Sequence, residues 1–170
     1  DHGYFMGPTS GLEDPRKTIV PLLAHADSLM LTRGILQNSI PKRTNIPIVL
    51  RVSSGNSILN EDLSNEKLCV SIEEAIRLNA SAVAFSIYIG GAYEHQTIVE
   101  FSKLVNDAHR YGIPVLAVTA VGKDMNRDLR YLSLASRIAV ELGADIVKTY
   151  YCDGFNELIT ACPVPVVIAG

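Results

Sequence analysis

Six short, nearly continuous hydrophobic runs recur along the chain, separated by longer segments of mixed polarity. The runs are Ser28–Thr32, Pro47–Val52, Ala82–Ile89, Ile113–Thr119, Asp145–Tyr150 and Val164–Ala169. A strand that alternates between apolar and polar residues has one face in solvent, whereas a continuous apolar run indicates burial on both faces. The pattern therefore predicts six strands of a parallel sheet.

The segments between these runs carry helix signals. Asp14 before Pro15 is typical of an N-cap followed by a first-turn proline, and Ser71 with Glu74 resembles a capping box. The predicted helices span residues 14–23, 71–78, 97–111, 127–142 and 155–161, and Ser53–Asn65 is the one extended polar loop. Repeated strand–helix units predict an α/β protein with right-handed crossovers.

The length of the chain limits its architecture. Its 170 residues suffice for one sizeable core and are too few for two domains, so we expect a single domain over residues 1–170. An open doubly wound sheet fits the pattern, and so does part of a (β/α)8 barrel, which needs about 250 residues. The pattern alone slightly favours the open sheet, but the strand-end residues favour the barrel. We therefore expect a TIM barrel that lacks its first strand, before Asp1, and its last unit, after Gly170.

Composition excludes several kinds of partner. Fifteen Lys and Arg against 18 Asp and Glu give a formal net charge of −3, which argues against nucleic acid or an anionic membrane. No apolar run approaches the roughly 20 residues that cross a bilayer. Three cysteines without a CxxC spacing indicate a reduced setting, so we expect a cytoplasmic protein. The four histidines lack metal-ligand spacing, and no GxGxxG or P-loop is present, so we expect neither a metal nor a bound cofactor.

Parallel α/β folds place their functional groups at the carboxyl ends of strands. Lys148 is the strongest candidate for a catalytic residue at these positions. It lies in an apolar run beside Ile146 and Val147. Burial lowers the pKa of a lysine, and a neutral amine can add to a ketone or aldehyde to form an imine. The alternative is a lysine that reaches solvent or pairs with an acid, and the spacing leaves both interpretations open. Arg51 and Ser53 lie at another strand end.

The remaining candidates also follow predicted strands. Asp1 and His2 could form an acid–base or substrate-orienting pair, and Tyr88 could donate a phenolic hydrogen bond. Lys123 could meet an anionic substrate, and Gly170 could open a phosphate-binding loop, since barrels often bind phosphate after their last two strands. Each also has a plain structural interpretation, as a turn, a rim aromatic, a solvated cation or a terminal glycine.

Seven segments in chain order carry a family resemblance. They are DHGYFMGPTSGLE, LMLTRGIL, NSILNEDLSNE, YIGGAYEHQ, VTAVGKDMNRDLRY, DIVKTYY and PVPVVIAG. Together they resemble the bacterial autoinducer-2 processing thiolases, which belong with the class I aldolases of the archaeal-type fructose-bisphosphate aldolase group. The resemblance covers essentially all 170 residues. Seven segments in order are far more specific than any one of them.

The resemblance implies roles for the candidate residues. It implies a (β/α)8 barrel in which Lys148, on the sixth strand, forms a Schiff base with the substrate. Asp1 would lie close to that lysine and assist proton transfer or orient the imine. His2 and Tyr88 would line the pocket, and the loop opened by Gly170 would hold phosphate.

The resemblance also implies a reaction and partners. The reaction is acetyl transfer from 3-hydroxy-5-phosphonooxypentane-2,4-dione to coenzyme A during breakdown of the quorum-sensing signal autoinducer-2. Coenzyme A would act as a co-substrate, with no bound cofactor. Relatives assemble as ring-based decamers, so a homo-oligomer is expected.

Two other hypotheses remain. The first is a class I aldolase or transaldolase acting on another phosphorylated sugar, such as fructose 1,6-bisphosphate. The bisphosphate aldolases keep an aromatic-rich WVYPRG-like segment after the fifth strand, where this chain has AVTAVGKD, and this departure favours the thiolase branch. The second is a non-catalytic barrel fragment that binds phosphorylated ligands.

Overall fold

The structure, a computed structural model, describes residues 3–9, 11–121 and 127–169. Within these ranges, six parallel strands form one sheet. They are β1 (Leu29–Thr32), β2 (Ile48–Arg51), β5 (Ala82–Ile89), β6 (Val115–Val121), β7 (Ile146–Tyr150) and β8 (Val166–Ala169). All six predicted strands are therefore confirmed, with ends within two residues of the predicted ones.

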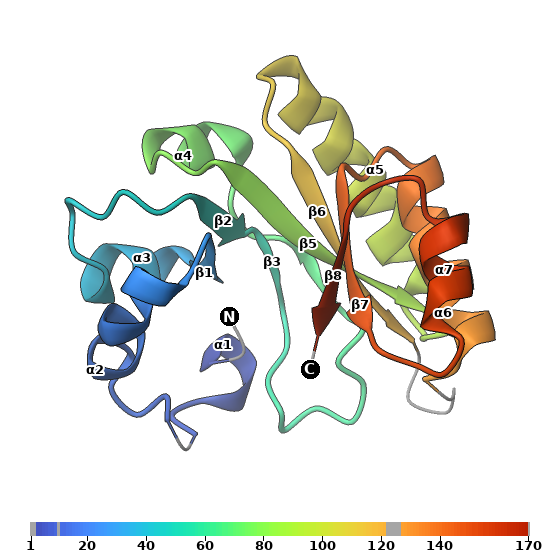
Figure 1. Cartoon of the computed structure of the whole chain (residues 1–170), viewed down its shortest axis with the longest axis horizontal. Coiled ribbons are helices and arrows are strands. Elements are labelled where there is room, and N and C mark those ends of the chain that lie inside the picture. Colours follow the sequence, from blue (N-terminus) through green and yellow to red (C-terminus); the bar gives the residue numbers. More distant parts are fainter. Residues whose placement is uncertain (1–2, 10, 122–126, 170) are drawn as a thin grey trace.

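The strands lie side by side in the order in which they occur along the chain. The order is β1-β2-β5-β6-β7-β8, and each strand pairs in parallel with the next. A doubly wound sheet reverses its strand order at a switch point, and the described sheet has no such reversal. The open doubly wound alternative is therefore wrong. The sheet curls into part of a barrel, as Figure 1 shows, which confirms the predicted fold class.

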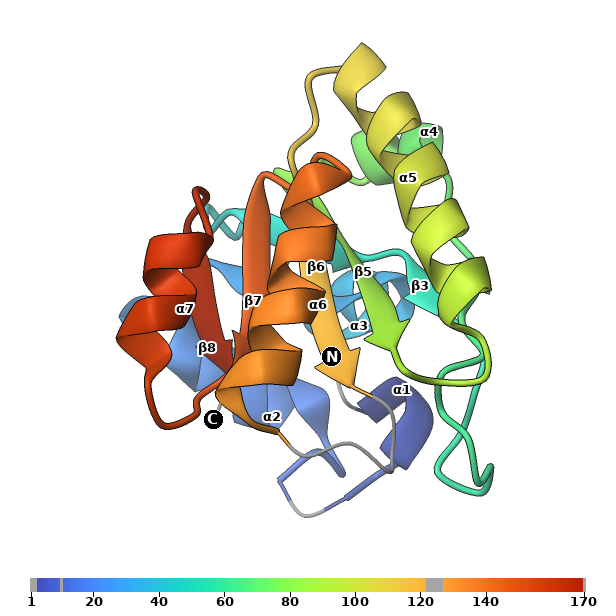
Figure 2. The same cartoon turned by 90° about the vertical axis from the view of Figure 1, so that its right-hand side faces the viewer.

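Four helices follow strands of the sheet as predicted. They are α4 (Ile72–Arg77), α5 (Glu94–Arg110), α6 (Leu129–Glu141) and α7 (Phe155–Ala161). Figure 2 shows α5, α6 and α7 on the outer side of the sheet. The predicted cap at Ser71 forms, since its side chain accepts a hydrogen bond from the Glu74 amide at 3.3 Å. Helix α5 begins three residues before the predicted start at Thr97, and α6 begins two residues after the predicted start at Arg127.

The predicted helix over residues 14–23 is only partly correct. Asp14 caps α2 (Pro15–Ile19) by accepting from the Lys17 amide at 3.2 Å, as expected. A 3-10 helix, η1 (Val20–His25), then replaces the α-helix. Proline has no amide hydrogen, so Pro21 cannot continue the hydrogen-bonding ladder of an α-helix.

Four short elements were not predicted. They are α1 (Gly3–Met6), α3 (Arg33–Ser39) and the antiparallel pair β3 (Ser53–Ser54) and β4 (Lys67–Leu68). The predicted polar loop Ser53–Asn65 is thus wrong at its start, where β3 forms. The rest of that loop connects β3 to β4, and this hairpin returns the chain to the end of β2.

The hydrophobic core lies between the sheet and the outer helices. On β5, Val83, Phe85 and Ile87 are fully buried, and the Phe85 ring lies 6.2 Å from that of Phe101 on α5. Successive residues of a strand point to opposite faces, so Ser86 and Tyr88 point to the inner side of the curved sheet. The outer face supplies the core, and the inner face supplies the candidate site.

Candidate active site

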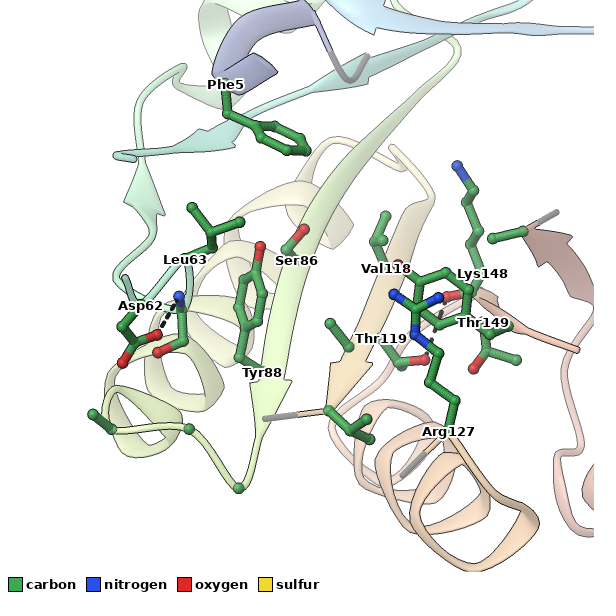
Figure 3. A pocket seen from close by; sticks show the side chains of 18 of the residues that line it. Phe5, Asp62, Leu63, Ser86, Tyr88, Val118, Thr119, Arg127, Lys148 and Thr149 are labelled. Atoms are coloured by element: carbon green, nitrogen blue, oxygen red, sulfur yellow. Dashed lines mark hydrogen bonds between the residues drawn. The ribbon is translucent and has the colours of Figure 1, made fainter. Parts of the chain in front are cut away.

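A cavity of about 850 Å³ opens at the carboxyl ends of the strands. Its lining comes from the inner faces and ends of β5, β6 and β7, from the turn at residues 90–92 and from the β3–β4 connection at residues 60–64. Figure 3 shows side chains from these elements around the same space. Active sites of parallel barrels occupy this end of the sheet, so the cavity is the candidate active site.

Lys148 lines this cavity from the inner face of β7. The strand register pairs it with Val118 of β6 and Val167 of β8. Its side chain is half-buried, and among the described residues its ammonium group has no hydrogen-bond or ion-pair partner. Burial lowers the pKa of this amine below its usual value, and the positive charge of Arg51 lowers it further. A lysine in this state has a larger fraction of the neutral, nucleophilic amine near neutral pH.

Arg51 and Glu66 form a buried ion pair on another wall of the cavity. Their side chains are 5% and 1% exposed, and Arg51 Nη2 lies 2.9 Å from Glu66 Oε2. Ser53 Oγ donates to the same carboxylate oxygen at 2.6 Å, and Arg51 donates to Ser86 Oγ at 2.6 Å. Buried charges are stable only when they are paired and hydrogen-bonded, and this pair meets both conditions.

Two tyrosines complete this network. The Tyr88 hydroxyl donates to Glu66 Oε1 at 3.2 Å, and the Tyr4 hydroxyl donates to the same oxygen. Burial raises the pKa of both phenols. The negative charge of Glu66 also raises both pKa values, while the charge of Arg51 opposes this increase. Both tyrosines therefore remain protonated, and Tyr88 is held against the cavity wall by Glu66.

The structure brings together two of the predicted site residues. Lys148 and Tyr88 line the same cavity, from β7 and β5. The predictions for Asp1, His2, Lys123 and Gly170 concern positions outside the described residues. Across the described ranges, no group of three or more His, Cys, Asp or Glu residues is arranged to hold a metal ion. None of the helices in those ranges has the length and hydropathy needed to span a bilayer.

Sequence reasoning missed Glu66 and Arg127. Glu66 lies in a polar segment, and only the β3–β4 hairpin brings it back beside Arg51. Arg127 was predicted only as the start of a helix, yet its guanidinium carbon lies 3.8 Å from the centre of the Tyr150 ring. A buried arginine such as Arg51 indicates that a carboxylate is needed nearby, but the sequence does not single out Glu66 from Glu61 and Asp62 in the same part of the chain.

The Cys152 thiol also lies near this end of the sheet, but its surroundings do not activate it. The residue is buried in a cluster with Leu132, Phe155 and Leu158. Burial raises the pKa of this thiol, and the charges of nearby aspartates raise it further. Reactive cysteines need a lowered pKa, so Lys148 is the better candidate nucleophile.

The fold and this cavity define part of a parallel α/β barrel with a half-buried lysine in the cavity at the carboxyl ends of its strands. The chain belongs to the DeoC/LacD family of aldolases, whose model matches residues 1–170. It is 59% identical over 171 residues to 3-hydroxy-5-phosphonooxypentane-2,4-dione thiolases of Photorhabdus laumondii and Klebsiella pneumoniae. Each alignment covers all of this chain and 58% of the relative, so the chain spans little more than half the length of these proteins.

Solved structures of class I aldolases share the fold. An archaeal fructose-1,6-bisphosphate aldolase, with its catalytic lysine bound to the carbinolamine intermediate of the substrate, superposes with a TM-score of 0.88 at 29% identity. A Schiff-base-forming fructose-1,6-bisphosphate aldolase gives a TM-score of 0.89 at 28% identity. Both matches cover all of this chain and 72% of the other. Lysine-based chemistry therefore occurs on this fold.

Proposed function

We propose that this chain carries the catalytic lysine of a thiolase that transfers acetyl from 3-hydroxy-5-phosphonooxypentane-2,4-dione to coenzyme A. One observation carries the proposal. The Lys148 amine enters the cavity half-buried, with a lowered pKa and without an anionic partner among the described residues. The names of the 59%-identical relatives support the substrate.

The first chemical step is imine formation. The neutral amine of Lys148 adds to the ketone carbon next to the phosphorylated carbon, and loss of water gives a protonated imine. The positive nitrogen then withdraws electrons from the carbon that bears the hydroxyl group. The imine thus prepares the bond between that carbon and the acetyl group for cleavage.

Acetyl transfer and release follow from this activation. The thiolate of coenzyme A attacks the acetyl carbonyl carbon, and the carbon–carbon bond breaks as its electrons move into the imine to form an enamine. The enamine carbon takes up the proton that the thiol lost, and water hydrolyses the resulting imine. The products are acetyl-CoA, a phosphorylated dihydroxyketone and the regenerated amine of Lys148.

The remaining site residues belong to this proposal. Asp1 assists proton transfer beside the imine, and His2 lines the pocket. Lys123 meets the anionic substrate, and the loop opened by Gly170 helps to hold its phosphate group. Tyr88 contributes a protonated phenol to the cavity wall, supported by its contact with Glu66. No resident metal or organic cofactor takes part, and coenzyme A is a co-substrate.

Assembly and location are further parts of the proposal. The resemblance to decameric relatives supports a homo-oligomer, and the three cysteines without a CxxC spacing support a cytoplasmic enzyme of autoinducer-2 breakdown. Analytical ultracentrifugation of the full-length protein tests the assembly. A species ten times the protomer mass is expected, and a monomer at micromolar concentration would contradict it.

The second candidate function is a class I aldolase acting on a phosphorylated sugar such as fructose 1,6-bisphosphate. The solved structures at 28–29% identity favour it. The AVTAVGKD segment argues against it, because the bisphosphate aldolases that this sequence resembles have an aromatic-rich WVYPRG-like segment there, and this segment of the chain supplies Val118 and Ala120 to the cavity lining. A non-catalytic ligand-binding role does not explain an unpaired, half-buried lysine.

Product analysis of the full-length protein separates these functions. It is incubated with the dione or with fructose 1,6-bisphosphate, each with and without coenzyme A. Acetyl-CoA that forms only from the dione is the expected result. Efficient cleavage of either compound without coenzyme A would favour an aldolase, and no turnover of either would favour the non-catalytic role.

A further inference from the structure

A third cation, Arg127, faces the same cavity as Lys148 and Arg51. Tyr150 is the last residue of β7 and lies two positions after Lys148, so both side chains project from the same face of the strand. The guanidinium carbon of Arg127 lies 3.8 Å from the centre of the Tyr150 ring, and both residues line the cavity. Figure 3 shows Arg127 rising from the start of α6 toward the ends of β6 and β7.

The stacking contact holds Arg127 without using its hydrogen-bond donors. A guanidinium group has five N–H donors in one plane, and stacking on a ring leaves the edge of that plane available. Among the described residues, no carboxylate forms an ion pair with Arg127, and none of its N–H groups has a hydrogen-bond acceptor. The Arg127 side chain is therefore oriented and has unused donor capacity.

The other charged side chains along the cavity are either a buried, paired arginine or acidic. Arg51 is buried and donates to Glu66 and Ser86. The acidic groups lie on the β3–β4 connection, where Asp62 accepts from the Ser64 amide at 2.8 Å and Glu61 is exposed. The cavity thus has an acidic side at residues 61–62 and a cationic side at Arg127 and Lys148. An anionic ligand would place its negative group toward β7.

We propose that Arg127, held on the Tyr150 ring, binds a phosphate group of a ligand in this cavity. Planar guanidinium donors match the oxygens of a phosphate group, which can accept two parallel hydrogen bonds. The assignment rests on the proposed function, which supplies two sources of this chemistry. One is the phosphate ester of the dione, and the other is the set of phosphates in coenzyme A.

The test measures whether Arg127 recognises phosphate specifically, using Arg127→Gln in the full-length protein. Its matched control is Arg130→Gln, which removes the same charge from an exposed position on α6 outside the cavity lining. Each variant is assayed with the phosphorylated dione and its phosphate-free counterpart, and with coenzyme A and phosphate-free pantetheine. The quantity compared is kcat/KM for each phosphorylated compound relative to its phosphate-free partner.

Arg127→Gln is expected to lower kcat/KM roughly 10- to 100-fold for one phosphorylated compound, the usual effect of losing charge-assisted hydrogen bonds. The phosphate-free partner and the Arg130→Gln protein should change less than about twofold. A loss that depends on the dione's phosphate identifies the substrate ester as the ligand, and one that depends on the phosphates of coenzyme A identifies the co-substrate. An equal loss with and without phosphate, or no loss, would overturn the proposal.

Direct binding separates this proposal from the proposed function. Inorganic phosphate is titrated calorimetrically into the full-length Arg127→Gln and Arg130→Gln proteins, which requires no turnover. Weaker phosphate binding by Arg127→Gln than by Arg130→Gln is expected, and it would support the site even if no acetyl-CoA formed. Equal binding by the two variants would overturn the site, even if the thiolase activity were established.

Discussion

Arg51 and Lys148 line the same cavity as Arg127, and the surroundings of these two cations are opposite. Arg51, at the end of β2, is 6% exposed and donates to Glu66, Ser53 and Ser86. Lys148, on β7, is half-buried and has no side-chain partner among the described residues. The Arg51 wall is a satisfied network, whereas the Lys148 wall presents a free amine.

The difference shows how residue type determines what burial does to a cation. The guanidinium of arginine keeps its proton under all ordinary conditions, so a buried arginine needs a carboxylate such as Glu66. Desolvation lowers the pKa of an ammonium group, so a larger fraction of Lys148 is the neutral, nucleophilic amine. A buried arginine gains no such reactivity, because it keeps its proton. The permanent charge of Arg51 adds to this effect by lowering the pKa of Lys148.

The largest expected effect comes from removing the reactive amine. Lys148→Met should lower acetyl-CoA formation by about 10⁴-fold or more, because no other described group replaces an imine-forming amine. The fold should survive, since the substitution removes a partly desolvated charge without breaking an ion pair. The measurement is steady-state turnover, with Lys103→Met on the exposed face of α5 as the control. Retained turnover in Lys148→Met would show that the cavity works without an imine.

The next largest effect concerns the opposite wall. Arg51→Met leaves the Glu66 carboxylate buried without its cation, which should reduce the free energy of unfolding by about 3–5 kcal/mol. The control is Arg137→Met, which breaks an exposed pair with Glu141 and should cost less than about 1 kcal/mol. Urea unfolding of both variants gives the comparison. Similar losses in the two would mean that the Arg51 network contributes no more than a surface ion pair.

A pH dependence connects the two walls. The neutral amine of Lys148 is the reactive form, so adduct formation should decrease as the pH falls through its pKa. Because burial and Arg51 lower that pKa, the decrease should be centred below the value of about 10.4 for an ordinary lysine. In Arg51→Met the midpoint should move to higher pH, since a repelling positive charge is lost. Rates of borohydride trapping across pH measure both midpoints, and identical midpoints would contradict the coupling.

The smallest effect lies away from the cavity. Ser71→Ala removes the side-chain cap of α4 and should cost about 1 kcal/mol of stability. The midpoint of urea unfolding measures this loss, and the trapping rate at the cavity should not change. Slower trapping in Ser71→Ala would mean that the outer helices and the site are not independent.

Local sequence patterns predicted the six strands of the sheet and the lysine that lines the cavity from β7. Continuous apolar runs indicated the six strands, and an isolated lysine in such a run indicated Lys148. The Arg51–Glu66 pair joins residues 15 positions apart through a hairpin of two-residue strands, which has no periodic signal. The stack of Arg127 on Tyr150 joins the start of α6 to the end of β7. Contacts of this kind depend on tertiary geometry, so the sequence pattern does not reveal them.

Chemical trapping of the Lys148 adduct tests the central claim most directly. The full-length protein is incubated with the phosphorylated dione, reduced with borohydride, digested and mapped by mass spectrometry. The expected result is one reduced adduct, located on the peptide that contains DIVKTYY and missing from the Lys148→Met protein. An adduct on another lysine, or none while acetyl-CoA still forms, would contradict the assignment of Lys148 as the imine-forming residue.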